Sequence, residues 1–275
     1  SLLDVSTIYL EPVVLEHPRG MEVLGRFPGA ERVGAATEAE HRFLRALLGG
    51  ELRQGALGGV MADAVARATG IPKPALDRAM MLRGDARAVV AAVMRDGESA
   101  LAAFRMEVGR PVAPMLAAPA KTLEEAFEKT GPAAVECKLD GARVQVHRSG
   151  RDVAVFTRSL DDITAKAPDV VAAALALPAG ALILDGEAIS LRDDGRPELF
   201  QVTASRLASG QAGVGAVFFD VLHAGGEDLL DRPGRDRAAA LDDLVAPDMR
   251  IRRVLADDAA AAAAFRDEAL ASGHE

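Results

Sequence analysis

The spacing of apolar residues predicts a helical region in the first part of the chain. Between residues 37 and 104, apolar positions recur every three or four residues, as on one face of an amphipathic helix. A first helix is predicted after Thr37, which has the capping-box spacing to Glu40, and it ends at Gly49. A second is predicted from Val60 to Ala68. We therefore expect an all-α segment up to about residue 113.

The period changes at residues 109–114, where two prolines and a glycine predict a linker. Beyond it, Val144 and Val146 alternate with polar residues, and a turn at 149–152 leads into an apolar run at 153–156, which predicts a β-hairpin. The other expected elements are strands at 181–184, 216–221 and 250–255, and helices at about 161–177, 235–244 and 257–271. This mixture predicts an α+β domain.

The composition is that of a globular chain. It has 275 residues, of which 49% are hydrophobic and 27% charged, enough for two packed domains. The chain contains no run of about eighteen consecutive apolar residues without a charged one, and the N-terminus lacks a signal-peptide pattern. We therefore expect a cytoplasmic protein without a membrane span. The single cysteine, Cys137, cannot form an internal disulfide, which agrees with a reducing compartment. It is interpreted as a packing residue.

The net charge of -9 weakens a nucleic-acid hypothesis without excluding it. Residues 37–113 carry eleven basic side chains against nine acidic ones, a local charge of about +2. Only the field along a binding face decides phosphate attraction. His147, His223 and His274 have no metal-ligand spacing and are interpreted as ordinary surface residues.

Most of the candidate chemistry lies in residues 136–143, Glu-Cys-Lys-Leu-Asp-Gly-Ala-Arg. A lysine at the end of a strand, held by a rigid hairpin, could serve as a nucleophile if burial or a nearby cation lowered its pKa. The alternative is a surface hairpin in which Lys138, Asp140 and Arg143 form solvated ion pairs of little energetic value. The pattern alone leaves both interpretations open.

The same stretch resembles Lys-x-Asp-Gly-x-Arg, the signature of the covalent nucleotidyltransferases, which include ATP-dependent DNA ligases, RNA ligases and mRNA capping enzymes. Residues 156–160, 184–188 and 218–222 resemble further motifs of that superfamily in the expected order. Arg143 favours ATP-dependent over NAD-dependent ligases. Residues 48–55 and 61–66 resemble the helical DNA-binding domain of many cellular and actinobacterial-type DNA ligases, which capping enzymes and most RNA ligases lack. The chain is thus similar to an ATP-dependent DNA ligase.

This resemblance implies a nucleotide site built from five residues. Lys138 would form the phosphoramidate bond to AMP, and Glu136 would accept a hydrogen bond from the adenine amino group. Phe219 would stack on the adenine, whereas the adjacent Phe218 would point to the opposite face of its strand and into the core. Glu187 would hold the ribose or the metal, and Arg143 would contact the nucleotide.

The resemblance also implies contacts to nicked DNA and to Mg²⁺. Asp140 and Arg158 would lie at the 5′-phosphate of the nick, and Arg206 would touch DNA. Glu187 and Glu275 would be the metal ligands, since carboxylates suit hard cations. The expected substrates are therefore ATP and nicked double-stranded DNA, with Mg²⁺ as cofactor, and no specific protein partner can be inferred.

The resemblance implies a division into three parts. Residues 1–34 are not ligase-like and stay unassigned, and residues 35–113 would be a partial helical DNA-binding domain. Residues 114–275 would be an ATP-grasp-like nucleotidyltransferase (adenylation) domain with antiparallel sheets and ATP between them. We expect this domain to be truncated before the C-terminal lysine motifs and the OB-fold, so that the fragment itself cannot seal nicks.

Two alternatives remain open at this point. The first is an RNA ligase or an mRNA capping nucleotidyltransferase, which the helical segment disfavours. The second is a non-catalytic DNA-binding derivative of a ligase, which would not take up AMP from ATP.

Overall fold

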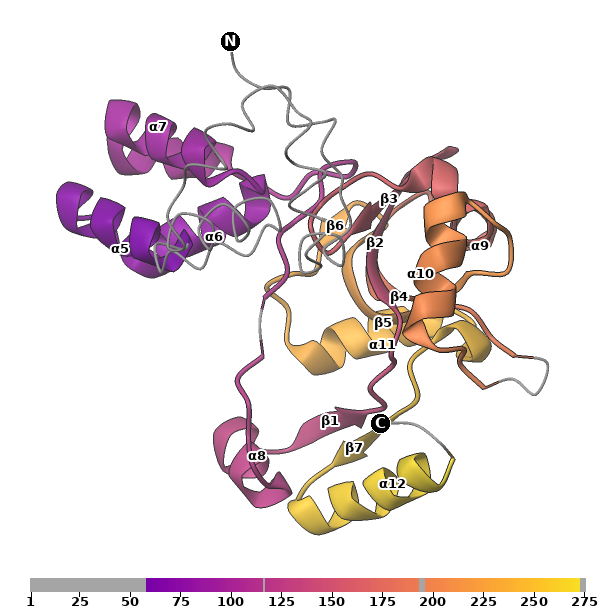
Figure 1. Cartoon of the computed structure of the whole chain (residues 1–275). Helices are drawn as coiled ribbons and strands as arrows, with labels where there is room; N and C mark the ends of the chain where they lie inside the picture. Colours follow the sequence, from indigo (N-terminus) through magenta and orange to yellow (C-terminus); the bar gives the residue numbers. More distant parts are fainter. Residues whose placement is uncertain (1–57, 116, 193–195, 273–275) are drawn as a thin grey trace, which may run out of the picture. The chain divides into compact units, whose positions relative to one another are not determined.

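The computed structural model describes residues 58–115, 117–192 and 196–272 (Figure 1). The expected helix after Thr37, the unassigned first 34 residues, His274 and Glu275 lie outside these ranges. Residues 62–275 form one compact unit. Across the described residues, no helix is both long and apolar enough to span a bilayer.

The helical part consists of α5 (Gly58–Thr69), α6 (Lys73–Arg83), α7 (Ala86–Asp96) and the 3₁₀ helix η2 (Gly97–Ala103). Gly84 ends α6 in the left-handed conformation, at φ 68°, which glycine adopts without strain. Directly after it, the Asp85 side chain caps α7 by accepting hydrogen bonds from the Arg87 and Ala88 amides. Leu76, Val89 and neighbouring apolar residues form the shared core. The predicted second helix is confirmed as α5.

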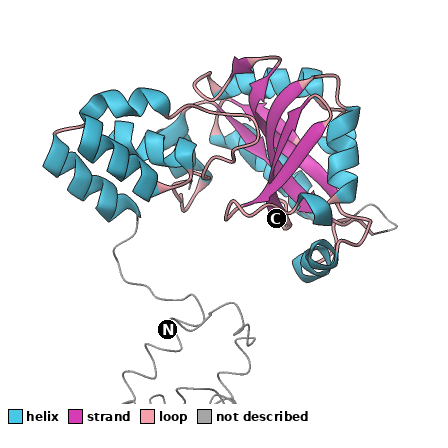
Figure 2. Cartoon of the chain, turned by 90° about the horizontal axis from the view of Figure 1, so that it is seen from above, coloured by secondary structure: helices cyan, strands magenta, loops and turns pink. Residues whose placement is uncertain are grey.

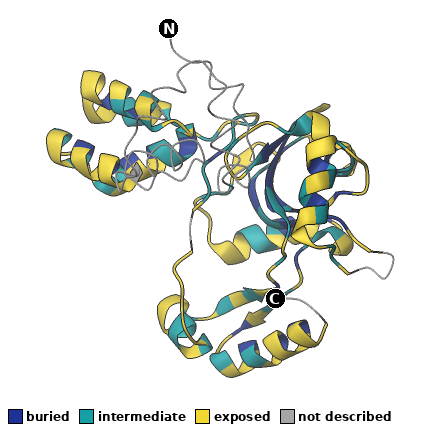
Figure 3. Ribbon diagram, viewed as in Figure 1, coloured by how far each residue is buried: buried dark blue, intermediate teal, exposed yellow. Residues whose placement is uncertain are grey.

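A five-stranded antiparallel sheet, the large sheet, forms the centre of the remaining chain (Figure 2). Its order is β3-β2-β4-β5-β6, and the predicted hairpin is confirmed as β2 and β3, with Val146 opposite Val155. Buried residues are concentrated along these strands (Figure 3). The strands are β2 (Ala142–Ser149), β3 (Asp152–Thr157), β4 (Ala181–Ile189), β5 (Gly215–Ala224) and β6 (Glu227–Asp228).

One face of the large sheet packs against helices. Val144, Leu184 and Phe218 of the sheet share a core with side chains from α9 (Pro168–Ala176), α10 (Phe200–Ser209) and α11 (Gly234–Leu244). The single helix expected at 161–177 is instead the 3₁₀ helix η3 (Thr164–Lys166) followed by α9. Pro168 explains the break, because a proline fits the first turn of a helix but not its interior.

The opposite face of the large sheet is covered at one end by the helical part and the linker. Leu82 of α6 and Val112 of the linker pack on Ile183 and Leu222. His147 is only 1% exposed: Gly109 donates its amide to Nδ1 at 2.9 Å, and Nε2 lies 2.9 Å from Oε1 of Gln145. The expectation of a surface histidine was wrong here, because the linker folds back over β2.

A separate two-stranded sheet, the small sheet, pairs β1 (Ala133–Glu136) with β7 (Arg253–Ala256). The helix α12 (Ala259–Ala271) packs on β7 and on α8 (Leu123–Thr130), and Val135, Val254 and Phe265 share one core. The expected β1–β2 hairpin was therefore wrong: β1 and β2 belong to different sheets. Residues 137–141, the crossing segment, connect them. The 3₁₀ helix η4 (Pro247–Met249) precedes β7.

Candidate nucleotide-binding site

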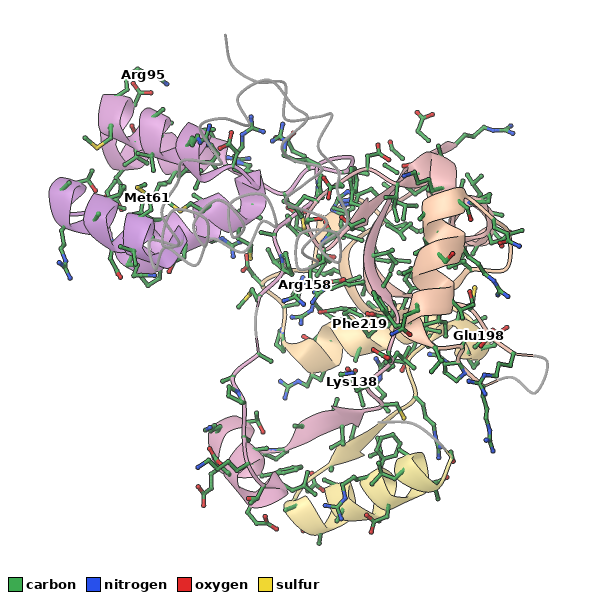
Figure 4. All side chains as sticks on the ribbon, in the orientation of Figure 1. Met61, Arg95, Lys138, Arg158, Glu198 and Phe219 are labelled. Carbon is green, nitrogen blue, oxygen red and sulfur yellow. The ribbon has the colours of Figure 1, made fainter. Side chains whose placement is uncertain are left out.

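The crossing segment carries Lys138 between the two sheets (Figure 4). The Cys137 amide donates to the Arg252 carbonyl at 3.1 Å, which continues the β1–β7 pairing, and its side chain is buried as a packing residue. Lys138 and Asp140 are exposed. The lysine thus lies on a strand-anchored segment at the junction of the two sheets.

Two glycines of the motifs permit close backbone contacts at this junction. A Cβ on Gly141 would lie 2.4 Å from the Ala188 carbonyl oxygen and 2.8 Å from Cγ of Glu187. A Cβ on Gly186 would lie 2.7 Å from the Val217 carbonyl oxygen. No real Cβ tolerates such distances, so both positions require glycine for steric reasons. The crossing segment can therefore lie directly against β4 only with Gly141 in place.

Arg143 contacts both Asp185 and Phe219 in the middle of the site. Its guanidinium donates to both oxygens of the buried Asp185, Nε at 3.0 Å and Nη2 at 2.5 Å. Its Cζ also lies 5.4 Å from the ring centroid of Phe219, within cation–π range. Burial raises the pKa of Asp185, and the Arg143 guanidinium opposes that rise. The Asp185 carboxylate is thus shielded from water, whereas the Arg143 side chain is only partly buried.

Phe219 reaches the site through a β-bulge in β5. Asp185 is paired with Asp220 and Gly186 with Phe218, so Phe219 has no residue opposite it on β4. Phe218 is fully buried in the core, whereas Phe219 keeps part of its ring exposed on the other face. The expectation that one of the two adjacent phenylalanines serves the core is confirmed.

Glu187 has a strongly perturbed carboxyl group. It lies opposite Arg143 in the β2–β4 ladder, and the Gly141 amide donates a hydrogen bond to it. Burial raises its pKa to about 7, although the charges of Arg143 and Lys138 act in the opposite direction. The carboxyl is therefore close enough to Lys138 for the two charges to influence each other. Carboxyl groups with such pKa values are typical of functional sites.

The first of two cavities at the site has a volume of about 470 Å³. Arg143, Arg158 and Lys166 bring three positive charges to it, against the single acidic group of Glu187. Phe200 and other side chains of α10 form an apolar wall. A cavity with this charge balance suits an anion such as a phosphate.

The second cavity has a volume of about 600 Å³ and lies between the small sheet, β5 and α11. Glu136 of β1, Phe219 of β5 and Arg253 of β7 line it. Burial raises the pKa of Glu136, while the nearby Arg253 opposes the rise. A flat aromatic ring beside a carboxylate acceptor is chemically suited to a base that carries an amino group.

The structure brings most of the expected site residues together. Arg143, Arg158 and Glu187 line the first cavity, Glu136 and Phe219 line the second, and Arg143 contacts Phe219 between them. The crossing segment supplies the two other expected residues, Lys138 and Asp140.

Two expected site residues are not part of this group. Arg206 of α10 donates to the Gly213 carbonyl at 3.5 Å and lines neither cavity. Glu275 lies outside the described residues.

Lys166 and Arg253 were not recognised from the sequence. No motif marks either residue, and they reach the cavities only through the positions of η3 and β7. Their presence could be inferred only from the tertiary arrangement. Within the described ranges, no group of three or more acidic, histidine or cysteine side chains forms a metal cage.

The chain resembles known DNA ligases along most of its length. Residues 114–275 match the family model described as "ATP dependent DNA ligase domain". A probable DNA ligase of Mycobacterium sp. (strain KMS) is 56% identical over 251 residues, which cover 90% of this chain and 48% of the relative. One from Mycobacterium marinum is 54% identical over 254 residues, covering 88% and 50%. The chain spans about half the length of the curated relatives it matches.

Among solved structures, the ligase domain of M. tuberculosis LigD is 26% identical, with a TM-score of 0.44 over 59% of this chain and 51% of that one. The relatives described above are named as DNA ligases, so the RNA ligase and capping alternatives are not favoured. The family match covers more than half of the chain, including the crossing segment and both cavities. On this basis, the chain belongs to the ATP-dependent DNA ligase family.

Proposed function

We propose that this chain is the adenylate-forming part of a DNA ligase and that Lys138 accepts AMP from ATP. The supporting observation is that Lys138 lies on the chain between Glu136, which lines the second cavity, and Gly141, which lines the first, and that its charge acts on Glu187. The apolar and acceptor groups of the second cavity suit the base, and the basic first cavity suits phosphate. The parent enzyme would use the adenylate to seal nicks in duplex DNA.

The transfer to Lys138 balances as a nucleophilic displacement. The Lys138 ammonium first loses a proton to solvent, because only the neutral amine is nucleophilic. Its Nζ then forms a bond to the α-phosphorus of ATP while the bond from that phosphorus to the bridging oxygen breaks, and pyrophosphate leaves. The nitrogen loses its second proton to solvent, which gives the phosphoramidate. In the later steps AMP passes to the 5′-phosphate of the nick, and the adjacent 3′-hydroxyl displaces it.

The other site residues would serve binding and orientation. Glu136 would accept a hydrogen bond from the adenine amino group, Phe219 would stack on the ring, and Glu187 would hold the ribose or the metal. Arg143 would contact the nucleotide, and its pairing with Asp185 holds its guanidinium in a fixed orientation.

Contacts to the nick would come from the basic side of the site. Asp140 and Arg158 would orient the 5′-phosphate, and Arg206 would touch DNA farther along α10. The helical part, with α5, α6 and α7, would bind the duplex. Because its substrate would be DNA, the protein would act in the cytoplasm. Support comes from the exposed position of Arg158 beside two further cations of the first cavity.

Mg²⁺ fits this site as a partly substrate-held ion. It is usually bound by one or two carboxylates together with phosphate oxygens, and Glu187 offers one carboxylate at the junction. Glu187, with Glu275 as the second expected ligand, would hold the ion, which would neutralise phosphate charge.

Transfer of a label from ATP tests the proposal. This chain and a chimera that adds the remaining half of the Mycobacterium relative would be incubated with Mg²⁺ and ATP labelled at the α-phosphate. We expect protein-bound label in the chimera and none in its Lys138→Arg variant, which keeps the charge but not the lysine nucleophile. ATP labelled at the γ-phosphate should leave no label on the chimera or on its Lys138→Arg variant. A folded chimera that takes up no α-label, or a Lys138→Arg variant that takes it up equally, would refute the proposal.

A further inference from the structure

Arg253 lies beside the residue expected to read the nucleotide base. It is directly opposite Glu136 in the β1–β7 ladder, and both side chains line the second cavity. Nη1 of Arg253 is 4.0 Å from Oε1 of Glu136. The sequence motifs contain Glu136 but give no sign of a basic partner for it.

The Arg253 side chain is anchored from behind. It is only 11% exposed, and its Nη2 donates to the Ala238 carbonyl at 2.8 Å and to Oδ1 of Asp242 at 2.5 Å. Asp242 also pairs with Arg250, which fixes the carboxylate. Its Nη1, by contrast, is buried without a hydrogen-bond partner in the described part of the chain. A buried donor left unpaired is costly, so the Glu136 carboxylate, whose Oε1 lies 4.0 Å away, is a natural partner for it.

The remaining charges around Glu136 do not replace Arg253. Asp220 of β5 acts on Glu136 as a like charge, and Arg237 of α11 is already engaged with both oxygens of Asp220, at 2.9 and 3.0 Å. Arg235 and Asp257, one of each sign, also line the cavity. Arg253 is the cation that counteracts the burial of Glu136.

We propose that Arg253 is a positioning residue that fixes the Glu136 carboxylate as a hydrogen-bond acceptor, and that it thereby makes the site select adenine over guanine nucleotides. Adenine presents an amino donor at the position where guanine presents a carbonyl oxygen, which a carboxylate repels. The inference rests on the proposed function, because it takes Glu136 as the contact to the base.

The test compares two adjacent arginines. Arg253→Gln removes the charge beside Glu136, whereas Arg252→Gln is a matched control, since Arg252 pairs with Glu268, lies over Phe265 and lines neither cavity. Binding of ATP and GTP to the full chain would be followed by NMR titration. We expect Arg253→Gln to reduce the preference for ATP about tenfold, the scale of one hydrogen bond to a charged group. Arg252→Gln should keep the wild-type preference.

A double-mutant cycle separates positioning from a general structural effect. Once Glu136→Gln has removed the carboxylate, adding Arg253→Gln should cause no further loss of ATP preference. If Arg253→Gln does not fold, Arg253→Lys takes its place. One ammonium group cannot hold Asp242 and also reach Glu136, so we expect the same loss. A folded Arg253 variant with the wild-type ATP preference, or losses that add independently of Glu136, overturns the inference.

A ligand-free readout distinguishes failure of this inference from failure of the proposed function. The pKa of the Glu136 carboxyl, measured by NMR of carbon-labelled glutamate, should rise in Arg253→Gln and stay unchanged in Arg252→Gln. An unchanged value in Arg253→Gln overturns the role of Arg253, whatever the chain does with ATP. Wild-type protein that binds ATP and GTP equally would overturn both the adenine site and this inference. The transfer of α-label from ATP to Lys138 would still test the ligase chemistry on its own.

Discussion

The Arg143–Asp185 pair makes a prediction about stability that is independent of catalysis. Arg143 belongs to the nucleotidyltransferase signature, so loss of activity on its substitution would ordinarily be attributed to lost ligand contacts. In the structure its guanidinium is the partner of a carboxylate whose side chain is 9% exposed. We therefore expect Arg143→Gln to destabilise the fold itself, by leaving Asp185 buried without its cation.

The magnitude follows from the burial of the two partners. Removing one member of a buried ion pair costs about 3–5 kcal/mol, and the 31% exposure of the Arg143 side chain places this pair near the lower end, at about 3 kcal/mol. Burial raises the pKa of Asp185, and without Arg143 it would rise further. When a carboxyl has a higher pKa in the folded than in the unfolded protein, the protein loses stability as the pH rises through the folded value. The loss of unfolding free energy caused by Arg143→Gln should thus be larger at neutral than at acidic pH.

Urea unfolding followed by circular dichroism measures these differences. The matched control is Arg192→Gln, which breaks an ion pair to Glu198 at 3.3 Å with partners 46% and 25% exposed and should cost less than about 1 kcal/mol. The double variant Arg143→Gln, Asp185→Asn should recover much of the lost stability, because the buried group is then neutral. Equal effects of Arg143→Gln and Arg192→Gln, or no recovery in the double variant, would refute the reasoning.

Three further predictions concern other parts of the fold. Gly141→Ala places a Cβ 2.4 Å from the Ala188 carbonyl oxygen and should cost about 1–3 kcal/mol in urea unfolding, whereas Gly180→Ala, with open space around it, should change little. Burial lowers the pKa of His147 from 6.5 to about 4, so only the unfolded chain binds the proton between these pH values. Lowering the pH from 6.5 to 4 should therefore reduce the free energy of unfolding by about 3 kcal/mol, and His147→Gln should weaken this pH dependence. Asp85→Ala removes the cap of α7 and should lower the free energy of unfolding by about 1 kcal/mol, with no loss expected if the cap is not formed in solution.

Local patterns predicted the elements whose contacts are near in sequence. The hairpin of β2 and β3 followed from the alternation around Val144 and Val146, and α11 lies within one residue of its expected start. The Ala-rich stretch forms α12, with Asp258 as its cap. In each case the deciding interactions join residues a few positions apart, which is the range that periodicity and capping can report.

The site depends on pairings that periodicity cannot report. β1 pairs with β7, more than one hundred residues later, so the stretch after Glu136 was interpreted as a hairpin although it crosses between two sheets. His147 was placed on the surface because nothing local reveals that residue 109 folds over it. Arg253 was missed for the same reason. The motifs located the candidate site residues along the chain, and only the fold shows which of them lie close together.

The central claim is that the Lys138 amine becomes bonded to AMP. The most direct measurement is proteolysis of the ATP-treated chimera followed by tandem mass spectrometry under alkaline conditions, which preserve a phosphoramidate. The account predicts one adenylylated peptide, with the AMP mass on Lys138. An adenylate found on a different lysine such as Lys166, or a chimera that seals nicks while Lys138 stays unmodified throughout, would contradict it.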